Sequence, residues 1–196
     1  MITEILALII RFGIILLKLE LEKPEDFSGV EDLYDICFSP SRKVLSSYRL
    51  RENVKPIDKL CYLAKNETGS ILSAVRYWPI KIQSFKLLLL DPLAVHPTIQ
   101  AEGHGNHIIN ETLTRAEKFG WQAVILIGDL SYYGQFNFVI AKSIEFPLPT
   151  NPERTLIKSL NGFDISLIKG KVYAQAKKVV FFENRKKYFK ILKYIN

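Results

Sequence analysis

Alternating or continuous hydrophobic positions predict a series of strands along this chain. Over 17–21 leucines alternate with charged residues, which is the period of a half-buried strand. The apolar run 87–90 is unbroken, as in a strand buried on both faces. An Asn-Glu-Thr-Gly turn at 66–69 joins two of the strands. The predicted strands cover 17–21, 60–65, 71–82, 85–95 and 121–127, with weaker ones at 143–148 and 163–173.

Apolar residues at helical spacing predict helices between these strands. In the first helix, a proline and two acids suit the first turn. In the second, Val44, Leu45 and Tyr48 are expected to face inward. The helical segments begin at 23–26 and cover about 41–51, 105–119, 130–136 and 152–160. The order predicts an α/β (α+β) fold with one strand–loop–helix–strand unit in its middle.

The length and composition fit one globular domain. A chain of 196 residues is long enough for one substantial core and short for two. With 48% hydrophobic and 24% charged residues, wholesale disorder is excluded. Cys37 and Cys61 lie far apart in apolar stretches, and neither they nor the three histidines show metal-ligand spacing. We therefore expect no metal, and two reduced core thiols in a cytoplasmic protein.

The net charge of +7 is concentrated at the C-terminal end. Nine cations and one acid lie from residue 165 onward, so that end carries +8 and the rest of the chain −1. Over the tail, apolar and basic residues fall on different sides of a helix. Such a helix suits an acidic membrane surface or nucleic acid; the alternative, which we favour, is a solvated helix that closes the domain. The oligomeric state stays open, a homodimer included.

The first 16 residues form an apolar extension. Glu4 and Arg11 interrupt it, and it has neither a basic start nor a cleavage site, so it fits neither a signal peptide nor a membrane span. It is either a helix packed on the domain or on a membrane surface, or the product of a misassigned start near Leu17. The predicted organisation is an N-terminal extension over 1–16, one domain over 17–174 and a basic tail over 175–196.

The segment from Leu90 to Gly105 carries the candidate chemistry. A buried strand is followed by a loop with Gly103 and Gly105, which leads into a helix. Glycines let backbone N–H groups approach an anion closely, and the helix N-terminus adds the positive end of its dipole. The pattern predicts a phosphate cradle that needs no basic side chain, although an ordinary turn would also account for two glycines.

The same segment resembles the acetyl-CoA-binding motif of the GNAT superfamily of N-acetyltransferases. The stretch L-A-V-H-P-x-x-Q-x-x-G-x-G over 93–105 fits the family pattern Q/R-x-x-G-x-G/A. The stretch A-V-I-L-I-G-D-x-x-Y-Y-x-x-F-N-F over 123–138 is similar to the strand and short helix that follow in that family. Upstream, 46–50 and 75–80 resemble its bacterial YhbS-type branch.

This resemblance implies a fold and a reaction. The fold is a mixed central sheet with two splayed central strands, flanked by helices. The reaction is direct transfer of an acetyl group from acetyl-CoA, as co-substrate, to a primary amine of a small molecule, peptide or protein. The alternative is a non-catalytic CoA-binding or interaction module of the same fold.

The resemblance also implies where acetyl-CoA binds. Its pantetheine arm would lie between the strands 87–95 and 121–127, against the backbone of Leu93, Ala94 and Val95, as an added strand would. A backbone N–H near Leu93 would polarise the thioester carbonyl. The residues implied around the pyrophosphate are Gln100, Ala101, Glu102, Gly103, His104, Gly105 and Asn106.

Tyr133 is the implied general acid. The family often has a tyrosine four residues before a Gly-Phe pair, which protonates the departing thiolate, and Tyr133 lies four residues before Asn137. The alternative is that Tyr133 only packs against the cofactor. Tyr132 is expected in the core, and the two tyrosines would exchange roles if the helix began one residue earlier.

Two aspartates have competing interpretations. Asp91 is a candidate general base for the acceptor ammonium, because a buried carboxylate can have a raised pKa. The alternative, which we favour, is a turn aspartate that accepts backbone N–H bonds ahead of Pro92. Asp129 is expected to cap the helix that follows it.

Four residues depart from the family pattern. Glu102 should repel a pyrophosphate, and His104 replaces a residue that is more often aliphatic. Asn137 replaces the glycine of the Gly-Phe pair, and Asp91 stands where close relatives commonly have glycine. These departures put the cofactor loop and the catalytic step in question.

Overall fold

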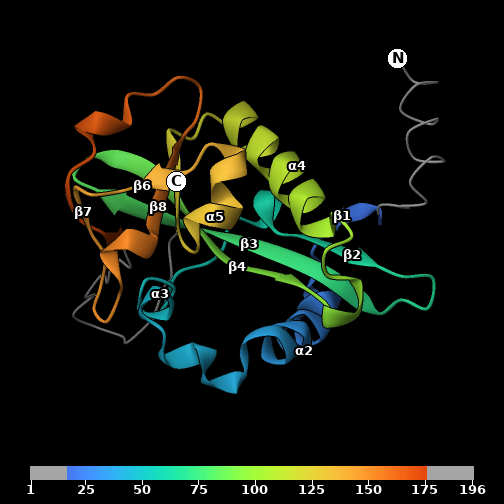
Figure 1. Cartoon of the computed structure of the whole chain (residues 1–196). Coiled ribbons are helices and arrows are strands. Elements are labelled where there is room, and N and C mark those ends of the chain that lie inside the picture. Colours follow the sequence, from blue (N-terminus) through green and yellow to red (C-terminus); the bar gives the residue numbers. More distant parts are fainter. Residues whose placement is uncertain (1–16, 176–196) are drawn as a thin grey trace, which may run out of the picture.

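The computed structural model describes residues 17–175 and shows one mixed sheet with helices on both of its faces (Figure 1). The predictions for the N-terminal extension and for most of the basic tail fall outside these residues. The division into extension, domain and tail stays a prediction.

Seven strands follow one another in the main sheet in the order β1-β2-β3-β4-β5-β8-β6, and β10 pairs with β3. All neighbours are antiparallel except β4 and β5, which are parallel. β7 and β9 form a separate two-stranded sheet. The strands are β1 (Leu19–Leu21), β2 (Tyr62–Lys65), β3 (Ile71–Ile82), β4 (Phe85–Val95), β5 (Ala123–Ile127), β6 (Val139–Ile140), β7 (Ile144–Glu145), β8 (Thr155–Ser159), β9 (Gly170–Lys171) and β10 (Tyr173–Ala174).

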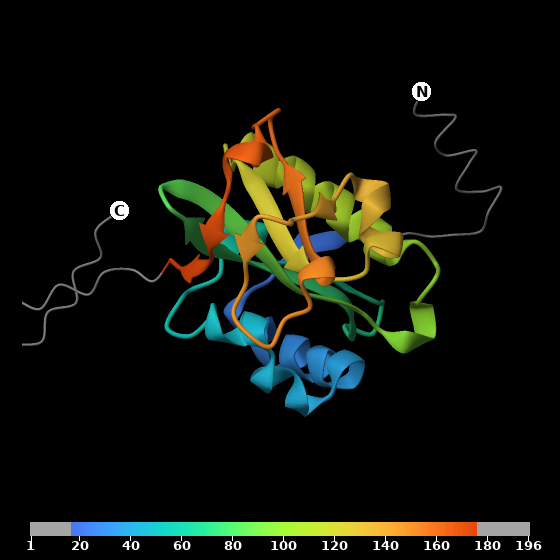
Figure 2. The same ribbon diagram turned by 60° about the vertical axis from the view of Figure 1, so that its left-hand side comes forward.

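The two long helices cover opposite faces of the sheet, as Figures 1 and 2 show. Residues of α4, such as Ile109 and Leu113, pack with Val75 on one face, whereas Leu33 of α2 packs with Ala74 on the other. Adjacent strand residues thus point to different helices, as the pleat requires. The helices are α2 (Phe27–Phe38), α3 (Ser46–Arg49), α4 (His104–Lys118) and α5 (Leu130–Tyr133), with short 3-10 turns at Pro24–Asp26, Pro40–Val44, Asp58–Leu60, Pro97–Ile99, Gly134–Phe136, Pro152–Arg154 and Ile165–Leu167.

The helix-like stretch predicted over 152–160 is wrong. After one 3-10 turn it becomes β8, which pairs with both β5 and β6. Leu156 and Ile157 point to different hydrophobic clusters, so the strand is buried on both faces and has no alternation to reveal it. The strand predicted over 163–173 is also wrong in most of its length, since only β9 and part of β10 fall within it.

Two of the three inward positions predicted for the second helix are wrong as well, whereas the third, Tyr48, is partly buried. Val44 is 75% exposed and Leu45 is 53% exposed. The charged Arg42 takes the inward place instead, where it pairs with Glu31 and Asp35. A buried ion network, which hydropathy alone does not reveal, therefore replaces the apolar face expected here.

Candidate active site

β4 and β5 separate partway along their length. They pair only from Leu87 to Leu89 on β4, with 123–125 on β5, although β4 continues to Val95. Beyond Leu89 the edge of β4 that faces β5 has no strand partner. The splay implied by the resemblance is present.

The open edge of β4 presents backbone N–H groups to this gap. The His96 N–H donates to the Leu72 carbonyl at 2.8 Å, and Ala94 lies opposite Ala74 in the same ladder. Bonded and non-bonded pairs alternate in an antiparallel ladder. The N–H groups of Leu93 and Val95 therefore point away from β3, into the gap.

A bulge lies just before Leu93. Asp91 and Pro92 together oppose the single residue Arg76 of β3, where the pairing register shifts. A bulge bends its strand and redirects the side chains next to it. This bend turns the end of β4 away from β5 and brings Asp91 to the wall of a pocket.

The N-terminus of α4 lies close to the open end of β4. Gly103 precedes the helix with a φ of 83°, and the His107 N–H is the first to bond back, to the Gly103 carbonyl. The N–H groups of His104, Gly105 and Asn106 thus have no partner within the helix. Free N–H groups at a helix start are what the predicted anion cradle requires, and the binding of an anion there stays a prediction.

Gly105 makes room for a side chain of α5. A Cβ at this position would lie 2.6 Å from the Tyr132 hydroxyl. The Tyr132 side chain therefore reaches from α5 to the first turn of α4. It is 37% exposed, so the prediction that Tyr132 belongs to the core is wrong.

A pocket of about 550 Å³ lies between the splayed strands, α3, α5 and the loop before β8. Leu93 and Ile127 line it from the two splayed strands, and Tyr133 lines it from α5. Ser46 and Thr150 close one edge, because their hydroxyls lie 2.5 Å apart. The two tyrosines meet edge to face, with ring centres 4.9 Å apart.

Tyr133 is held firmly in this pocket. Burial raises the pKa of its phenol well above the ordinary value, and the nearby Tyr132 and Asp91 raise it further. Its ring packs edge to face against Phe138. The side chain is therefore a neutral O–H donor across the physiological range.

Asp91 makes an ion pair, not the turn contacts that we favoured. Arg51 Nη1 donates to Asp91 Oδ2 at 2.9 Å, and Trp78 Nε1 donates to the Asp91 carbonyl at 2.5 Å. Burial raises the pKa of the carboxyl, although the charge and hydrogen bond of Arg51 and the Ser47 hydroxyl oppose that rise. The side chain lies in a strand bulge, so the interpretation as a turn aspartate is wrong.

Asp129 precedes α5, but its side chain makes no capping hydrogen bond. It pairs instead with Arg154 at 3.1 Å on the pocket wall. The capping prediction is therefore wrong for the side chain.

Comparisons with known proteins agree with this geometry. No family model matches the chain. It is 26% identical over 125 residues to the N-acetyltransferase YhbS of Escherichia coli (strain K12), a match that covers 63% of this chain and 74% of YhbS. The crystal structure of E. coli YhbS in complex with CoA superposes with a TM-score of 0.69 at 22% identity, over 82% of this chain and 90% of that one. The chain has the GNAT fold. A GNAT family acetyltransferase from Brucella melitensis in complex with acetyl-CoA superposes with a TM-score of 0.61 at 22% identity, over 82% and 96% of the two chains.

The resemblance to the GNAT superfamily and its YhbS branch is thus confirmed, and so is the fold class. Within residues 17–175, no helix is long and apolar enough to cross a membrane. In the same range no group of three or more His, Cys, Asp and Glu side chains could hold a metal ion.

Asn137, which stands where the GNAT pattern has glycine, adopts a left-handed backbone conformation. Its φ is 64°, in the left-handed region that glycine and asparagine enter most readily. This departure therefore preserves the backbone turn between α5 and β6.

Sequence reasoning missed the polar partners of the pocket. The sequence identified Asp91 and Asp129 but not the residues that contact them, which are Arg51, Ser47 and Arg154. No local signal marks them, because Arg51 and Asp91 are 40 residues apart and meet only in the fold.

Gly128→Ala should lower the acetyl-transfer rate about tenfold or more. A Cβ at Gly128 would clash with Tyr133 Cε2, so the partly buried ring must move, and a small displacement of a group in the catalytic role predicted for Tyr133 is costly. The measurement is kcat with acetyl-CoA and an amine. The matched control is Gly134→Ala, whose Cβ would meet only Leu130 Cδ1, at 3.8 Å. Equal rates for both variants would contradict the prediction.

Glu102→Gln should tighten acetyl-CoA binding by about two- to fivefold at low salt, the scale of a surface charge interaction. Glu102 is the acid of the predicted cradle and its side chain is 53% exposed. Its carboxylate lies 3.4 Å from His104 Nε2, and no Lys or Arg lies between 96 and 107. Calorimetric titration at two salt concentrations measures the effect, which should shrink as salt rises. Glu117→Gln, at the other end of α4, is the control. An unchanged Kd would show that Glu102 does not face the pyrophosphate.

Proposed function

We propose that this chain is an N-acetyltransferase that transfers the acetyl group of acetyl-CoA directly to a primary amine. The observation that carries the proposal is the pocket between the splayed strands, in which the partly buried Tyr133 side chain and the open edge of β4 at Leu93 line one space. The similarity to E. coli YhbS and to the Brucella acetyltransferase supports it.

Acetyl-CoA would bind along the open edge of β4. The pantetheine amides would pair with the backbone of Leu93, Ala94 and Val95 as an added strand does. The pyrophosphate would sit on the N–H groups at the start of α4. The proposed residues of that cradle are Gln100, Ala101, Glu102, Gly103, His104, Gly105 and Asn106.

The acceptor amine would attack the thioester carbonyl carbon. The N–H of Leu93 would stabilise the negative charge on the carbonyl oxygen. As the tetrahedral intermediate collapses, the C–S bond breaks and Tyr133 gives its proton to the sulfur. Asp91 would take one proton from the acceptor ammonium before the attack, and the second proton that the nitrogen loses would pass through water to the Tyr133 phenolate.

Tyr133 and Asp91 suit these roles for different reasons. A phenol with a raised pKa stays protonated and ready to donate. A carboxyl with a raised pKa is a stronger base than an ordinary aspartate. Water would regenerate both groups after each turnover.

Thiol release tests the proposal. Acetyl-CoA is mixed with the full chain and with polyamines, aromatic amines, amino acids or peptides, and free CoA is measured. At least one amine should raise CoA release well above hydrolysis. A protein that is stabilised thermally by acetyl-CoA and accelerates transfer to none of these amines would instead be a CoA-binding module, an alternative that Glu102 favours.

The cellular setting is a further part of the proposal. A cytoplasmic bacterial enzyme fits the bacterial relatives and the two free thiols at Cys37 and Cys61. Fractionation of cells that express the chain tests the location.

A further inference from the structure

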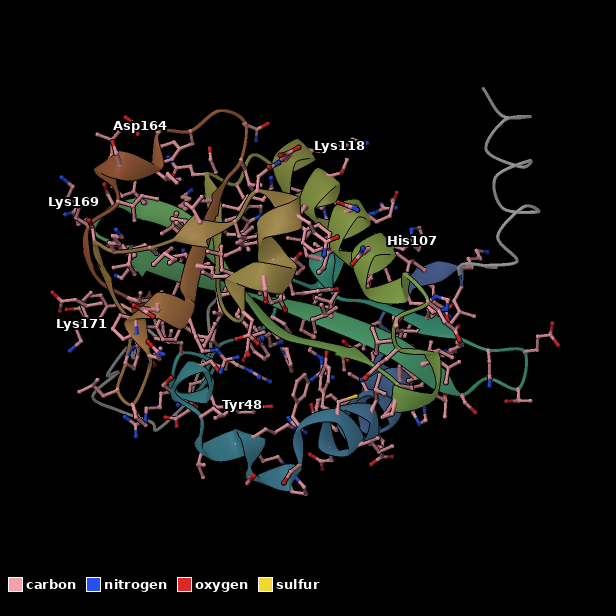
Figure 3. The ribbon with its side chains drawn as sticks, in the orientation of Figure 1. Tyr48, His107, Lys118, Asp164, Lys169 and Lys171 are labelled. Carbon is pink, nitrogen blue, oxygen red and sulfur yellow. The ribbon has the colours of Figure 1, made fainter. Side chains whose placement is uncertain are left out.

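Arg51 lies behind the pocket wall in an aromatic slot. Its guanidinium carbon is 3.8 Å from the centre of the Tyr48 ring and 4.5 Å from that of Trp78. The side chain is only 7% exposed, and its Nε has no hydrogen-bond partner. Tyr48 extends from α3 toward α2, as Figure 3 shows.

Burying a charged guanidinium in this slot costs free energy. A buried guanidinium loses its hydration, and an apolar side chain of similar size would fill a core site at equal or lower free energy. The unpartnered Nε adds a further cost. What the guanidinium supplies and an apolar side chain lacks is its charge, which lies over the two ring faces and forms the 2.9 Å ion pair with Asp91, the one contact that reaches the pocket wall.

Asp91 is the acceptor of that ion pair and also part of the pocket wall. A carboxylate can accept about four hydrogen bonds. Arg51 and the Ser47 hydroxyl account for two, so the group retains the capacity to bind an ammonium. The bulge fixes its backbone, and Trp78 holds its carbonyl.

We propose that Arg51 is a positioning residue of the acceptor site, which holds the Asp91 carboxylate ionised against the pocket so that it can take a proton from an acceptor ammonium. The inference rests on the proposed function. It implies that the acceptors are alkylamines, which carry a proton at neutral pH, and that Arg51 matters less for amines that do not.

The groups around Asp91 determine in which direction its pKa changes when Arg51 is lost. The cations that act on the carboxylate are Arg51 and Arg42, and Arg42 is already paired with Glu31 and Asp35. The other groups around the pocket are the neutral phenols of Tyr48, Tyr132 and Tyr133 and the Asp129–Arg154 pair. Burial raises the pKa of Asp91 and Arg51 lowers it, so loss of Arg51 should raise that pKa further.

The test is the pH dependence of kcat/KM in Arg51→Met, Arg51→Lys and Lys43→Met, with benzylamine and aniline as acceptors. For benzylamine, the pH at which kcat/KM falls on the acidic side of the profile should rise by about one unit in Arg51→Met and by less in Arg51→Lys. Lys43→Met, which removes an exposed cation from the same region, should leave that pH unchanged. With aniline, which is unprotonated at neutral pH, Arg51→Met should lower kcat/KM much less.

Several outcomes separate this inference from the proposed function. A uniform loss of rate at every pH, equal for both amines, would mean that Arg51 is only structural and would overturn the inference. In an Asp91→Asn background, Arg51→Met should no longer shift the acidic side of the kcat/KM profile. If the wild-type chain transfers to no amine, the proposed function fails. The pKa of Asp91, read from its carboxyl infrared band with Asp91→Asn as reference, then still shows whether Arg51 keeps the group ionised, and an unchanged band in Arg51→Met would overturn that part.

Discussion

Tyr133→Phe is expected to lower kcat by about a hundredfold or more, the scale of general acid catalysis. The variant keeps the ring that packs against Phe138 and Tyr132 and loses only the hydroxyl. The affinity for acetyl-CoA should stay within about twofold, because the proposed cofactor contacts are made by backbone groups of β4 and α4. Initial rates and thermal shifts with acetyl-CoA measure the two quantities.

Tyr132→Phe is the matched control for this prediction. Its hydroxyl approaches Gly105 rather than the pocket centre, so its removal should affect the affinity for acetyl-CoA more than kcat. If Tyr132→Phe abolished turnover and Tyr133→Phe did not, the two tyrosines would have exchanged roles. If neither changed kcat, the sulfur would take its proton from water.

The part of the site that the sequence predicted is the part built from consecutive residues. The strand, loop and helix from Leu87 to Lys118 depend on local signals, namely an apolar run, two glycines and helical spacing, and all three elements are present. The acid that follows β5, Asp129, was also identified, although its partner Arg154 was not.

The features of the fold and the site that the sequence did not predict depend on contacts between distant segments. The sequence of β8 looks helical until its pairing with β5 and β6 is known, because pairing overrides weak local preference. Likewise, nothing near Arg42 indicates that a charged residue will be buried there, since its partners Glu31 and Asp35 lie on another helix. Buried charge is the class of feature that hydrophobic patterns predict least well.

The buried arginine of β3 provides the second prediction of large effect. Arg76→Met should lower the free energy of unfolding by about 3–5 kcal/mol, because it leaves the largely buried Glu22 carboxylate without a counter-ion and Glu31 with Arg42 alone. Arg76 pairs with Glu22 at 2.6 Å and with Glu31 at 2.6 Å, and its own side chain is 4% exposed. Denaturant unfolding, monitored by tryptophan fluorescence, measures the loss. Lys81→Met, an exposed change on the same strand, should cost little.

The pH dependence of this loss follows from the carboxylates. Burial raises the pKa of Glu31, but the hydrogen bonds from Arg42 and Arg76 outweigh it, so its pKa is below the ordinary 4.5. The ionised group therefore stabilises the fold above pH 4.5, and that contribution is lost as the pH falls through the lowered pKa. In Arg76→Met the carboxyl groups can be buried neutral at low pH. The difference in the free energy of unfolding between wild type and Arg76→Met should therefore become smaller as the pH falls. A second change, Glu22→Met, should recover part of the lost stability at neutral pH. If the difference in free energy stayed constant with pH, the loss would come from packing.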